Sequence, residues 1–277
     1  KKIYRQNEQH FIDLLNRIRN NIVLPKDLQE LNSRQLFLAQ EHLVKDTITL
    51  TTHNRKADTI NAAELEKLPG KSYRFEGLIE KEFNENALPT ELTLLLKEGA
   101  QVMFIRNDSG ESRRFFNGKL ATVSRIVKDE IYLIPVGEQA ELKLEKETWK
   151  NIRYNYNKEK DSIEEEELGS FTQYPVRLAW AITIHKSQGL TFEKAIIDAG
   201  QAFAPGQVYV ALSRCTSLQG LVLSSKIFAS AIQTNPQVIA FAERESGANE
   251  LSLLLDTEKK VFAITRLIKL FDWKKMI

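Results

Sequence analysis

The sequence predicts an α/β fold in which a mainly parallel sheet has helices on both faces and carries an inserted small all-β barrel. Short strands alternate with helical segments at both ends of the chain, which is typical of a parallel sheet. Residues 106–170 instead show short strands and turns without a helical period. We therefore assign residues 1–104 and 172–235 to the α/β domain, 105–171 to the barrel, and 236–277 to a helical extension or linker.

Each element of the α/β part has its own signal. Apolar residues at helical spacing predict helices, β-branched runs predict strands, and proline and glycine mark boundaries. In chain order we predict an amphipathic helix from Phe11 to Ile18, a short helix after Pro25, a strand at 47–51, a helix at 55–68 capped by Asn54, strands at 176–178, 194–197 and 221–223, and helices at 179–188, 207–214 and beyond Pro236.

The predicted barrel rests on turn signals. Asn107 to Gly110 and Asn117-Gly118 are turn sequences, and Asn-Gly between apolar runs is a strong hairpin signal. Several short strands with regular turns are typical of a small barrel. The strands predicted around these turns are 102–105, 120–127, 131–134 and 142–144.

Length and composition exclude several classes of protein. The 277 residues are 42% hydrophobic and 27% charged, which is the ordinary globular range. No apolar run approaches the ~20 residues of a membrane span, so we expect no membrane partner. Cys215 is the single cysteine, which excludes an internal disulfide and fits a reducing, cytoplasmic location. Because the first residues lack an initiator Met and a signal-peptide pattern, we expect the natural protein to extend upstream.

The net charge of +2 neither shows nor excludes a face that binds nucleic acid. Glu164 to Glu167 form an acidic run, which we interpret as solvated surface, because blocks of like charge repel and stay exposed. Solvated surface is also the simplest interpretation of a basic stretch that comprises Arg106, Arg113, Arg114, Lys119, Arg125 and Lys128.

No complete catalytic motif occurs in the sequence. The Gly-x-x-x-x-Gly-Lys-[Ser/Thr] phosphate loop is absent, and the four histidines are scattered without the spacing of metal ligands. We therefore predict no metal site. If the chain serves an enzyme, we expect it to supply groups to a site that is completed elsewhere.

Candidate functional residues gather in three segments, Tyr4-Arg5-Gln6, Ile184 to Gly189, and Gln207 to Arg214. Each segment also has an ordinary explanation. An arginine is most often a surface ion-pair residue, a histidine at a helix end can be a cap, and a tyrosine usually packs in a core. These explanations apply to Arg5 and Arg214, to His185, and to Tyr209.

In their order, these segments resemble the petite-integration-frequency (Pif-type) and RecD-like DNA helicases of superfamily one. The resemblance covers about residues 1–225 and rests on Tyr-Arg-Gln at 4–6, Thr-x-Asn at 52–54, Asn-Gly at 117–118, Leu-Ala-Trp-Ala-Ile-Thr-Ile-His-Lys-Ser-Gln-Gly at 178–189 and Val-Ala-Leu-Ser-Arg at 210–214. In such motors ATP lies between two RecA-like domains. The chain resembles the second, C-terminal one, with a Src-homology-like barrel inserted in it.

The resemblance implies which residues face the nucleotide. Arg5 and Arg214 resemble arginines that reach the γ-phosphate, so we expect them to converge on one face of the sheet. A planar guanidinium can bridge two phosphate oxygens. Thr191 stands where related motors often carry an acidic residue for the ribose, which leaves the ribose contact open. The other nucleotide-side residues are Tyr4, Gln188, Gly189 and Gln207. ATP and Mg²⁺ are implied in the full-length enzyme, with Mg²⁺ held mainly by the other domain.

The resemblance also implies a DNA side. A strand-to-helix turn can bind phosphate through hydroxyls and free N–H groups, although a plain N-cap explains Asn54 equally well. Aromatic rings in the barrel loop can stack on bases, although burial in the barrel core explains at least one Phe more simply. The implied DNA-contacting residues are Thr51, Thr52, His53, Asn54, Phe115, Phe116, Asn117, His185, Lys186 and Ser187.

We therefore predict the C-terminal motor portion of an ATP-dependent helicase that moves 5′ to 3′ on single-stranded DNA and unwinds duplex or forked DNA. It is expected to act as a monomer together with the N-terminal RecA-like domain of the same protein. By itself the chain should be inactive, because it lacks the phosphate loop. Two alternatives remain: a RecD-type nuclease subunit or relaxase helicase half, and a non-catalytic module that binds single-stranded nucleic acid.

Overall fold

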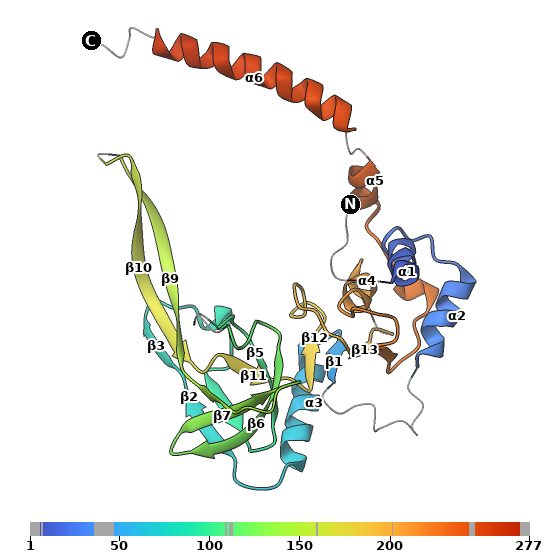
Figure 1. The fold of residues 1–277 in the computed structure, drawn as a ribbon, viewed down its shortest axis with the longest axis vertical. Coiled ribbons are helices and arrows are strands. Elements are labelled where there is room, and N and C mark those ends of the chain that lie inside the picture. The colour runs from blue at the N-terminus through green and yellow to red at the C-terminus, as the bar shows by residue number, and fades with distance from the viewer. Residues whose placement is uncertain are drawn as a thin grey trace. The chain divides into compact units, whose positions relative to one another are not determined.

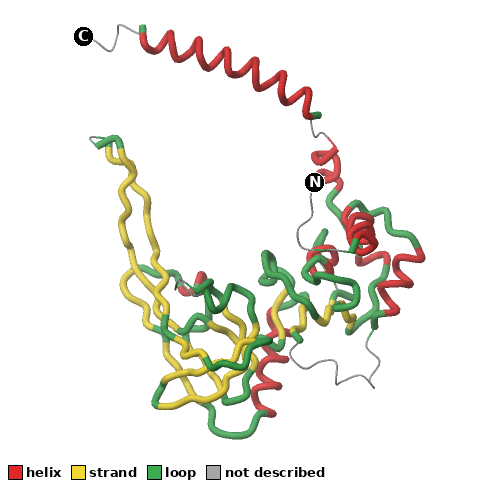
Figure 2. The backbone as a smooth tube through the Cα atoms, in the orientation of Figure 1, coloured by secondary structure: helices red, strands yellow, loops and turns green. Residues whose placement is uncertain are grey.

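The computed structural model describes residues 6, 8–35, 47–108, 110, 113–158, 160–200, 202–243 and 247–271. The chain divides into two units, Lys1–Gln233 and Thr234–Ile277. The first unit contains a parallel sheet with its helices and a set of antiparallel strands, each with its own hydrophobic core (Figures 1 and 2).

The parallel sheet has four strands in the order β12-β1-β13-β14, and all three neighbouring pairs are parallel. The strands are β1 (Ile48–Thr51), β12 (Ala181–Thr183), β13 (Ala195–Asp198) and β14 (Leu221–Leu223). They are rich in apolar residues because a parallel sheet is covered on its faces. Their carboxyl ends meet at one edge, where ligands of open α/β sheets bind. The predicted parallel sheet is confirmed.

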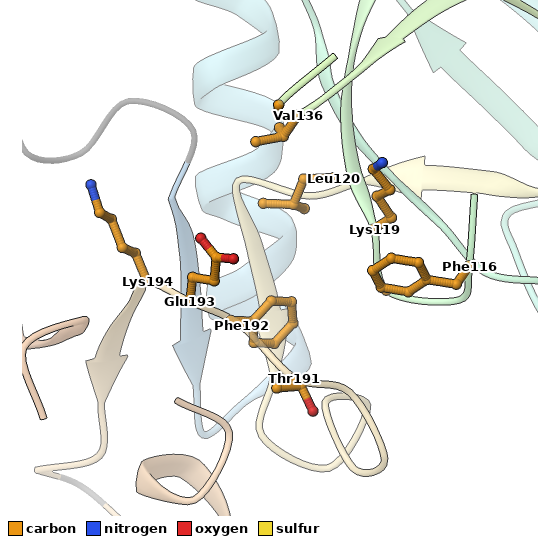
Figure 3. Close-up of a pocket in the computed structure, with 10 residues that line it drawn as sticks. Phe116, Lys119, Leu120, Val136, Thr191, Phe192, Glu193 and Lys194 are labelled. Carbon is orange, nitrogen blue, oxygen red and sulfur yellow. The ribbon is translucent and has the colours of Figure 1, made fainter. Parts of the chain in front are cut away.

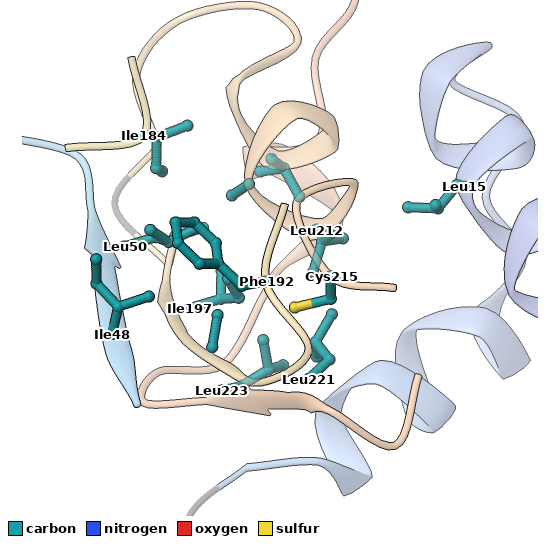
Figure 4. Close-up of a cluster of buried hydrophobic side chains, with 14 of the residues drawn as sticks. Leu15, Ile48, Leu50, Ile184, Phe192, Ile197, Leu212, Cys215, Leu221 and Leu223 are labelled. Carbon is teal, nitrogen blue, oxygen red and sulfur yellow. The ribbon is translucent and has the colours of Figure 1, made fainter. Parts of the chain in front are cut away.

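The helices of this part are α1 (Gln9–Arg19), α2 (Pro25–Ser33), α3 (Asn54–Lys67) and α4 (Gln207–Leu212). The buried face of α1 consists of the four apolar residues that predicted it, Phe11, Leu14, Leu15 and Ile18. Pro25 occupies the first turn of α2, where its missing N–H costs nothing. Figure 4 shows Leu15 of α1 in one buried cluster with Leu50 and Ile197 of the sheet and Leu212 of α4.

The helix predicted at 179–188 is wrong. Residues 181–183 form strand β12, and residues 184–189 form a series of turns. A short apolar run has the same composition in a buried strand and in a buried helix, so periodicity alone cannot separate them. Ala181, Ile182 and Thr183 are all buried, which fits a covered sheet strand. The candidate segment after Thr183 therefore follows a strand, not the end of a helix.

Residues 73–178 form the antiparallel part, here called the β region. A five-stranded sheet has the order β11-β5-β6-β7-β8, and smaller sheets have the orders β3-β10-β9 and β2-β4. The strands are β2 (Tyr73–Glu76), β3 (Leu78–Lys81), β4 (Thr93–Leu96), β5 (Gln101–Phe104), β6 (Leu120–Val127), β7 (Glu130–Pro135), β8 (Leu142–Leu144), β9 (Glu147–Asn157), β10 (Ser162–Gln173) and β11 (Val176–Leu178), with 3-10 helices η2 (Glu85–Ala87) and, outside this region, η3 (Ala229–Ala231).

The antiparallel pairing extends beyond residues 105–171. Strand β11 pairs antiparallel with β5, so the strand predicted at 176–178 does not join the parallel sheet as we expected. Its place there is taken by β12. A three-residue strand gives no sign in the sequence of which sheet it joins, because that depends on partners distant in the chain.

The charged stretches of the β region are solvated surface, as interpreted from the sequence. Strands β9 and β10 form a long two-stranded ribbon (Figure 1), and Glu164 to Glu167 are exposed on it. Three of these carboxylates pair with Lys160, Arg153 and Lys150. Four of the six basic residues of the other stretch are also in ion pairs, Arg106 with Glu147, Arg114 with Asp108, Lys119 with Glu138 and Arg125 with Glu141.

The second unit consists of α5 (Pro236–Glu243) and α6 (Ala248–Leu270), which agrees with the predicted helical tail. Many apolar residues of α6 are exposed, among them Leu253 at 73% and Phe262 at 67%. Among the described residues, no helix combines the length and the apolar character that crossing a membrane requires.

Candidate functional site

Arg214 lies two residues after the end of α4 and is only 8% exposed. Its Nε donates to the carbonyl of Val210 (2.9 Å), Nη1 to the carbonyl of Leu190 (3.3 Å) and Nη2 to Oγ of Ser213 (2.9 Å). The guanidinium therefore connects α4 with the segment that follows Gly189. This burial does not fit the alternative of a solvent-exposed surface arginine.

Gln6, from the N-terminal candidate segment, contacts the residues on either side of Arg214. Tyr4 and Arg5 lie outside the described residues, but their neighbour Gln6 is described and is 6% exposed. Its Nε2 donates to the carbonyls of Ser213 (3.0 Å) and Cys215 (3.1 Å), the residues on either side of Arg214. Gln6 was not predicted as a site residue; its only signal was its place within Tyr-Arg-Gln. Two segments more than 200 residues apart thus come together at Arg214.

Gln207 begins α4 and is 3% exposed. Its Oε1 accepts hydrogen bonds from the backbone N–H groups of Phe203 (3.0 Å) and Ala204 (3.4 Å). Its Nε2 is buried and has no hydrogen-bond partner among the described residues. Leaving a buried donor unsatisfied costs about 1–3 kcal/mol. The amide can therefore donate to a bound ligand at little further desolvation cost.

Residues 184–189 form a turn that is stabilised by a hydrogen bond between its own residues. Ser187 is fully buried, and its Oγ donates to the carbonyl of Ile184 (2.7 Å). Gly189 has a φ of +86°, a conformation that glycine adopts without strain. His185, Lys186 and Gln188 are exposed. The turn therefore presents these three side chains to solvent, while burial favours a structural role for Ser187.

The predicted phosphate-binding turn begins at the carboxyl end of β1. Thr51 is fully buried, and its Oγ1 donates to Oδ2 of Asp198 (3.4 Å), which favours a structural role for its side chain. Thr52 Oγ1 and His53 Nδ1 share a hydrogen bond of 2.7 Å. His53 and Asn54 are exposed. The N-cap position is His53, without a side-chain cap bond, and Asn54 is the first residue of α3.

Asp198 ends β13 and is 8% exposed. It forms an ion pair with Lys56 of α3 and accepts a hydrogen bond from Oγ of Ser225 (3.0 Å). Burial alone raises the pKa of Asp198, but the hydrogen bond and charge of Lys56, with hydrogen bonds from Ser225 and Ser224, outweigh it. The pKa therefore lies below its ordinary value, and the carboxylate stays ionised at neutral pH.

The aromatic residues of the predicted barrel loop differ in exposure. Phe115 stacks on Phe104 with ring centroids 4.0 Å apart and packs against the core of the β region. Packing against this core therefore explains Phe115. This agrees with the alternative given in the sequence analysis, that burial explains at least one of Phe115 and Phe116. Phe116 is 56% exposed. Asn117 is exposed, and its backbone N–H donates to Oδ1 of Asn107 (2.8 Å).

A pocket of about 520 Å³ lies between this loop and the segment after Gly189 (Figure 3). Phe116 and Thr191, predicted for different ligands, both line it. Its other lining residues mix apolar and charged side chains, Gly118, Lys119, Leu120, Val136, Gly137, Phe192, Glu193 and Lys194. Within the described part of the chain, no group of three or more His, Cys, Asp or Glu residues is arranged to hold a metal ion.

Comparisons with known proteins agree on one family. The human ATP-dependent DNA helicase PIF1 is 34% identical to the chain over 266 residues, which are 91% of the chain. The solved structure of unliganded Pif1 from Bacteroides sp. superposes on 90% of the chain with a TM-score of 0.79 and 36% identity. The chain is homologous to the Pif1 family of DNA helicases. Bacteroides Pif1 in complex with ADP-AlF3 and single-stranded DNA matches 88% of the chain, with a TM-score of 0.64 and 38% identity.

The chain covers only part of the length of its Pif1 relatives. The chain spans 38% of the human PIF1 and 57% of the Bacteroides Pif1 chain. No protein-family model matches the chain. The homology supports the mixed α/β fold with a parallel sheet, and it supports the superfamily-one resemblance that the motifs predicted.

Proposed function

We propose that the protein to which this chain belongs is an ATP-dependent DNA helicase, and that the chain is its C-terminal motor portion. Its relatives carry the name ATP-dependent DNA helicase, and the related Bacteroides Pif1 binds ADP-AlF3 and single-stranded DNA in a solved structure. From the family resemblance we propose 5′-to-3′ movement on single-stranded DNA and unwinding of duplex or forked DNA. ATP is the proposed fuel, with Mg²⁺ held mainly by residues outside this chain.

The observation that carries the proposal is the position of Gln6 on the carbonyls that flank Arg214. Arg5 precedes Gln6 directly in the sequence. From the family resemblance we propose that its guanidinium joins that of Arg214 at the nucleotide. A nucleotide held against another domain would meet Arg5 and Arg214 from the side of this chain, with Tyr4 proposed beside the adenine.

In this proposal Arg214 acts on the γ-phosphate. Phosphoryl transfer spreads negative charge over the equatorial oxygens, and a planar guanidinium can donate to two of them. Arg214 donates to the uncharged carbonyls of Val210 and Leu190 and to a hydroxyl. Closure of the site would exchange some of these acceptors for phosphate oxygens, which bind a guanidinium more strongly because they are charged. The unsatisfied amide of Gln207 is the second proposed nucleotide contact, with Gln188, Gly189 and Thr191 along the same side.

The proposed DNA contacts are the exposed side chains at the carboxyl edge of the sheet and at the β-region loop. His53, Asn54, His185 and Lys186 are exposed there, with the N–H groups at the start of α3 near Thr52. Free N–H groups at a helix start attract phosphate. Phe116 is exposed for stacking on bases.

The test of this function is Arg214→Lys in the intact helicase. Lysine keeps the positive charge but cannot reproduce the forked geometry, and an arginine finger is worth on the order of 10³–10⁵ in rate. We expect DNA-stimulated ATP hydrolysis to fall at least about 10³-fold, with single-stranded DNA affinity unchanged.

The matched control is Arg34→Lys. Arg34 also donates to backbone carbonyls of the same domain, those of Leu221 (3.1 Å) and Gln219 (2.6 Å), but lies outside the proposed site. Both variants lose comparable structural hydrogen bonds, so thermal denaturation should show similar small destabilisation. If both slow ATP hydrolysis equally, or if Arg214→Lys turns over near the normal rate, the finger assignment is lost.

A further inference from the structure

A continuous set of contacts leads from the proposed DNA side to the proposed nucleotide side. His53 lies in the turn after β1, and its ring packs on that of Phe203 with centroids 5.0 Å apart and a tilt of 38°. The backbone N–H of Phe203 donates to Oε1 of Gln207 (3.0 Å). His53 therefore contacts Phe203, and Phe203 in turn contacts Gln207 at the start of α4.

Both ends of this set are constrained. The hydrogen bond of 2.7 Å that His53 Nδ1 shares with Thr52 restricts the orientation of the imidazole ring. At the other end, the N–H groups of Phe203 and Ala204 restrict Oε1 of Gln207. Because an amide group is planar, the direction of Oε1 also fixes the direction of the unsatisfied Nε2.

The loop that carries Phe203 is anchored at its base. The N–H of Gly200 donates to Oγ of Ser225 (3.1 Å), and Ser225 in turn donates to Asp198 (3.0 Å). Lys56 of α3 holds the other side of Asp198. In the outer part of the loop, the ring of Phe203 packs on His53, and Phe203 is 59% exposed. An exposed aromatic ring contributes little to a core, so this contact serves the position of the loop.

We propose that Phe203 is a positioning residue that couples DNA binding at His53 to nucleotide binding at Gln207. The inference rests on the function proposed above. Phosphate bound at the turn after β1 holds His53 in one orientation, and the ring contact passes that constraint to the backbone of Phe203. The N–H groups of the loop then hold the Gln207 amide in the direction that the nucleotide requires.

Such coupling is reciprocal. If DNA strengthens nucleotide binding by some factor, the nucleotide must strengthen DNA binding by the same factor, and factors of about 5–150 are typical. The factor can therefore be measured at equilibrium, without turnover. It is the ratio of the dissociation constants for single-stranded DNA in the absence and presence of ADP–aluminium fluoride.

The experiment compares the intact helicase with Phe203→Ala, which removes the ring, and Phe203→Tyr, which keeps it. We expect the ratio to be at least about 5 in the unchanged protein and within about twofold of 1 in Phe203→Ala. Phe203→Tyr should restore it. The dissociation constant without nucleotide should stay within about twofold in all variants. Phe228→Ala is the matched control, because Phe228 is equally exposed at 60% and should keep the full ratio.

The outcomes separate this inference from the proposed function. If the unchanged protein fails to bind DNA or nucleotide, both proposals fail. If it binds both and Phe203→Ala keeps the ratio, or if the unchanged protein has a ratio near 1, only the coupling role is overturned. Weaker DNA binding by Phe203→Ala without nucleotide would make Phe203 a direct DNA contact and would also overturn it.

Discussion

A single ion pair, between Arg17 and Asp27, holds α1 and α2 together in the part of the chain that follows Gln6. Arg17 of α1 donates from Nε to Asp27 Oδ2 (2.8 Å) and from Nη2 to Oδ1 (2.9 Å). Asp27 of α2 is 1% exposed and also accepts the N–H of Leu24 (3.0 Å). The bidentate geometry and the burial make this pair stronger than an ordinary surface ion pair.

We predict that Asp27→Asn costs about 2 kcal/mol of unfolding free energy at neutral pH, because it removes charged hydrogen bonds from a buried site. The hydrogen bond from Arg17 lowers the pKa of Asp27 from its ordinary value of 3.8. A carboxyl whose pKa is lower in the folded protein stabilises it above that ordinary value and loses the contribution as the pH falls through the folded pKa. The difference from the unchanged protein should therefore shrink below pH 3.8.

Thermal or urea denaturation from neutral to acid pH checks this prediction. The matched control is Asp13→Asn on the neighbouring helix, whose side chain is exposed and should change stability by no more than about 0.5 kcal/mol. A difference between Asp27→Asn and the unchanged protein that is independent of pH would contradict the assigned cause.

At the residue scale, the sequence predicted candidate residues but not how each is held in the structure. Arg214 and Gln207 were predicted from motif order, and both are buried at α4. Their hydrogen bonds to Leu190 and to the Phe203 loop depend on tertiary contacts, which no local pattern reveals. The same holds for Gln6, whose partners lie more than 200 residues away.

At the scale of elements, helices with a clear apolar face were predictable and short buried strands were not. The spacing of the apolar residues of α1 extends over about two helical turns and fits a helix alone. In contrast, β12 has only three residues, and its apolar sequence fitted a helix as well. The sheet that a strand joins is decided by distant partners, which is why β11 was assigned to the wrong sheet.

The turn at Gly118 connects the β region with the candidate motif, and this contact can be tested. Gly118 has a φ of +97°, and a Cβ there would lie 2.9 Å from Cδ2 of Leu190. Leu190 follows Gly189 directly and is buried in the core of the parallel sheet. We predict that Gly118→Ala destabilises the protein through backbone strain and through this steric contact, and thermal denaturation should show it.

The control for this prediction is Gly137→Ala. Gly137 has a similar φ of +85° but no atom within 4 Å of the added Cβ, so that variant suffers the strain alone. We expect Gly118→Ala to be less stable than Gly137→Ala by about 1 kcal/mol, because a well-packed neighbour must shift. Equal losses would mean that the turn and the motif segment are not firmly packed together.

At the scale of the whole molecule, the proposed function gives the chain one side of a nucleotide site. Gln6 donates to the carbonyls on either side of Arg214, yet the sequence has no Gly-x-x-x-x-Gly-Lys-[Ser/Thr] loop to hold phosphates. Binding of the triphosphate needs backbone N–H groups and a lysine around the β- and γ-phosphates. Arginines that only stabilise the transition state cannot replace them.

We therefore predict that the 277-residue chain alone releases no phosphate from ATP above background and separates no duplex, even with saturating single-stranded DNA. The intact protein, assayed in parallel, should do both if the proposed function is right. A cooperative thermal transition and salt-dependent binding of single-stranded DNA would establish that the chain is folded in this assay, since phosphate contacts weaken with salt. Hydrolysis by the pure chain that disappears in Arg214→Ala would instead place a complete nucleotide site within these residues.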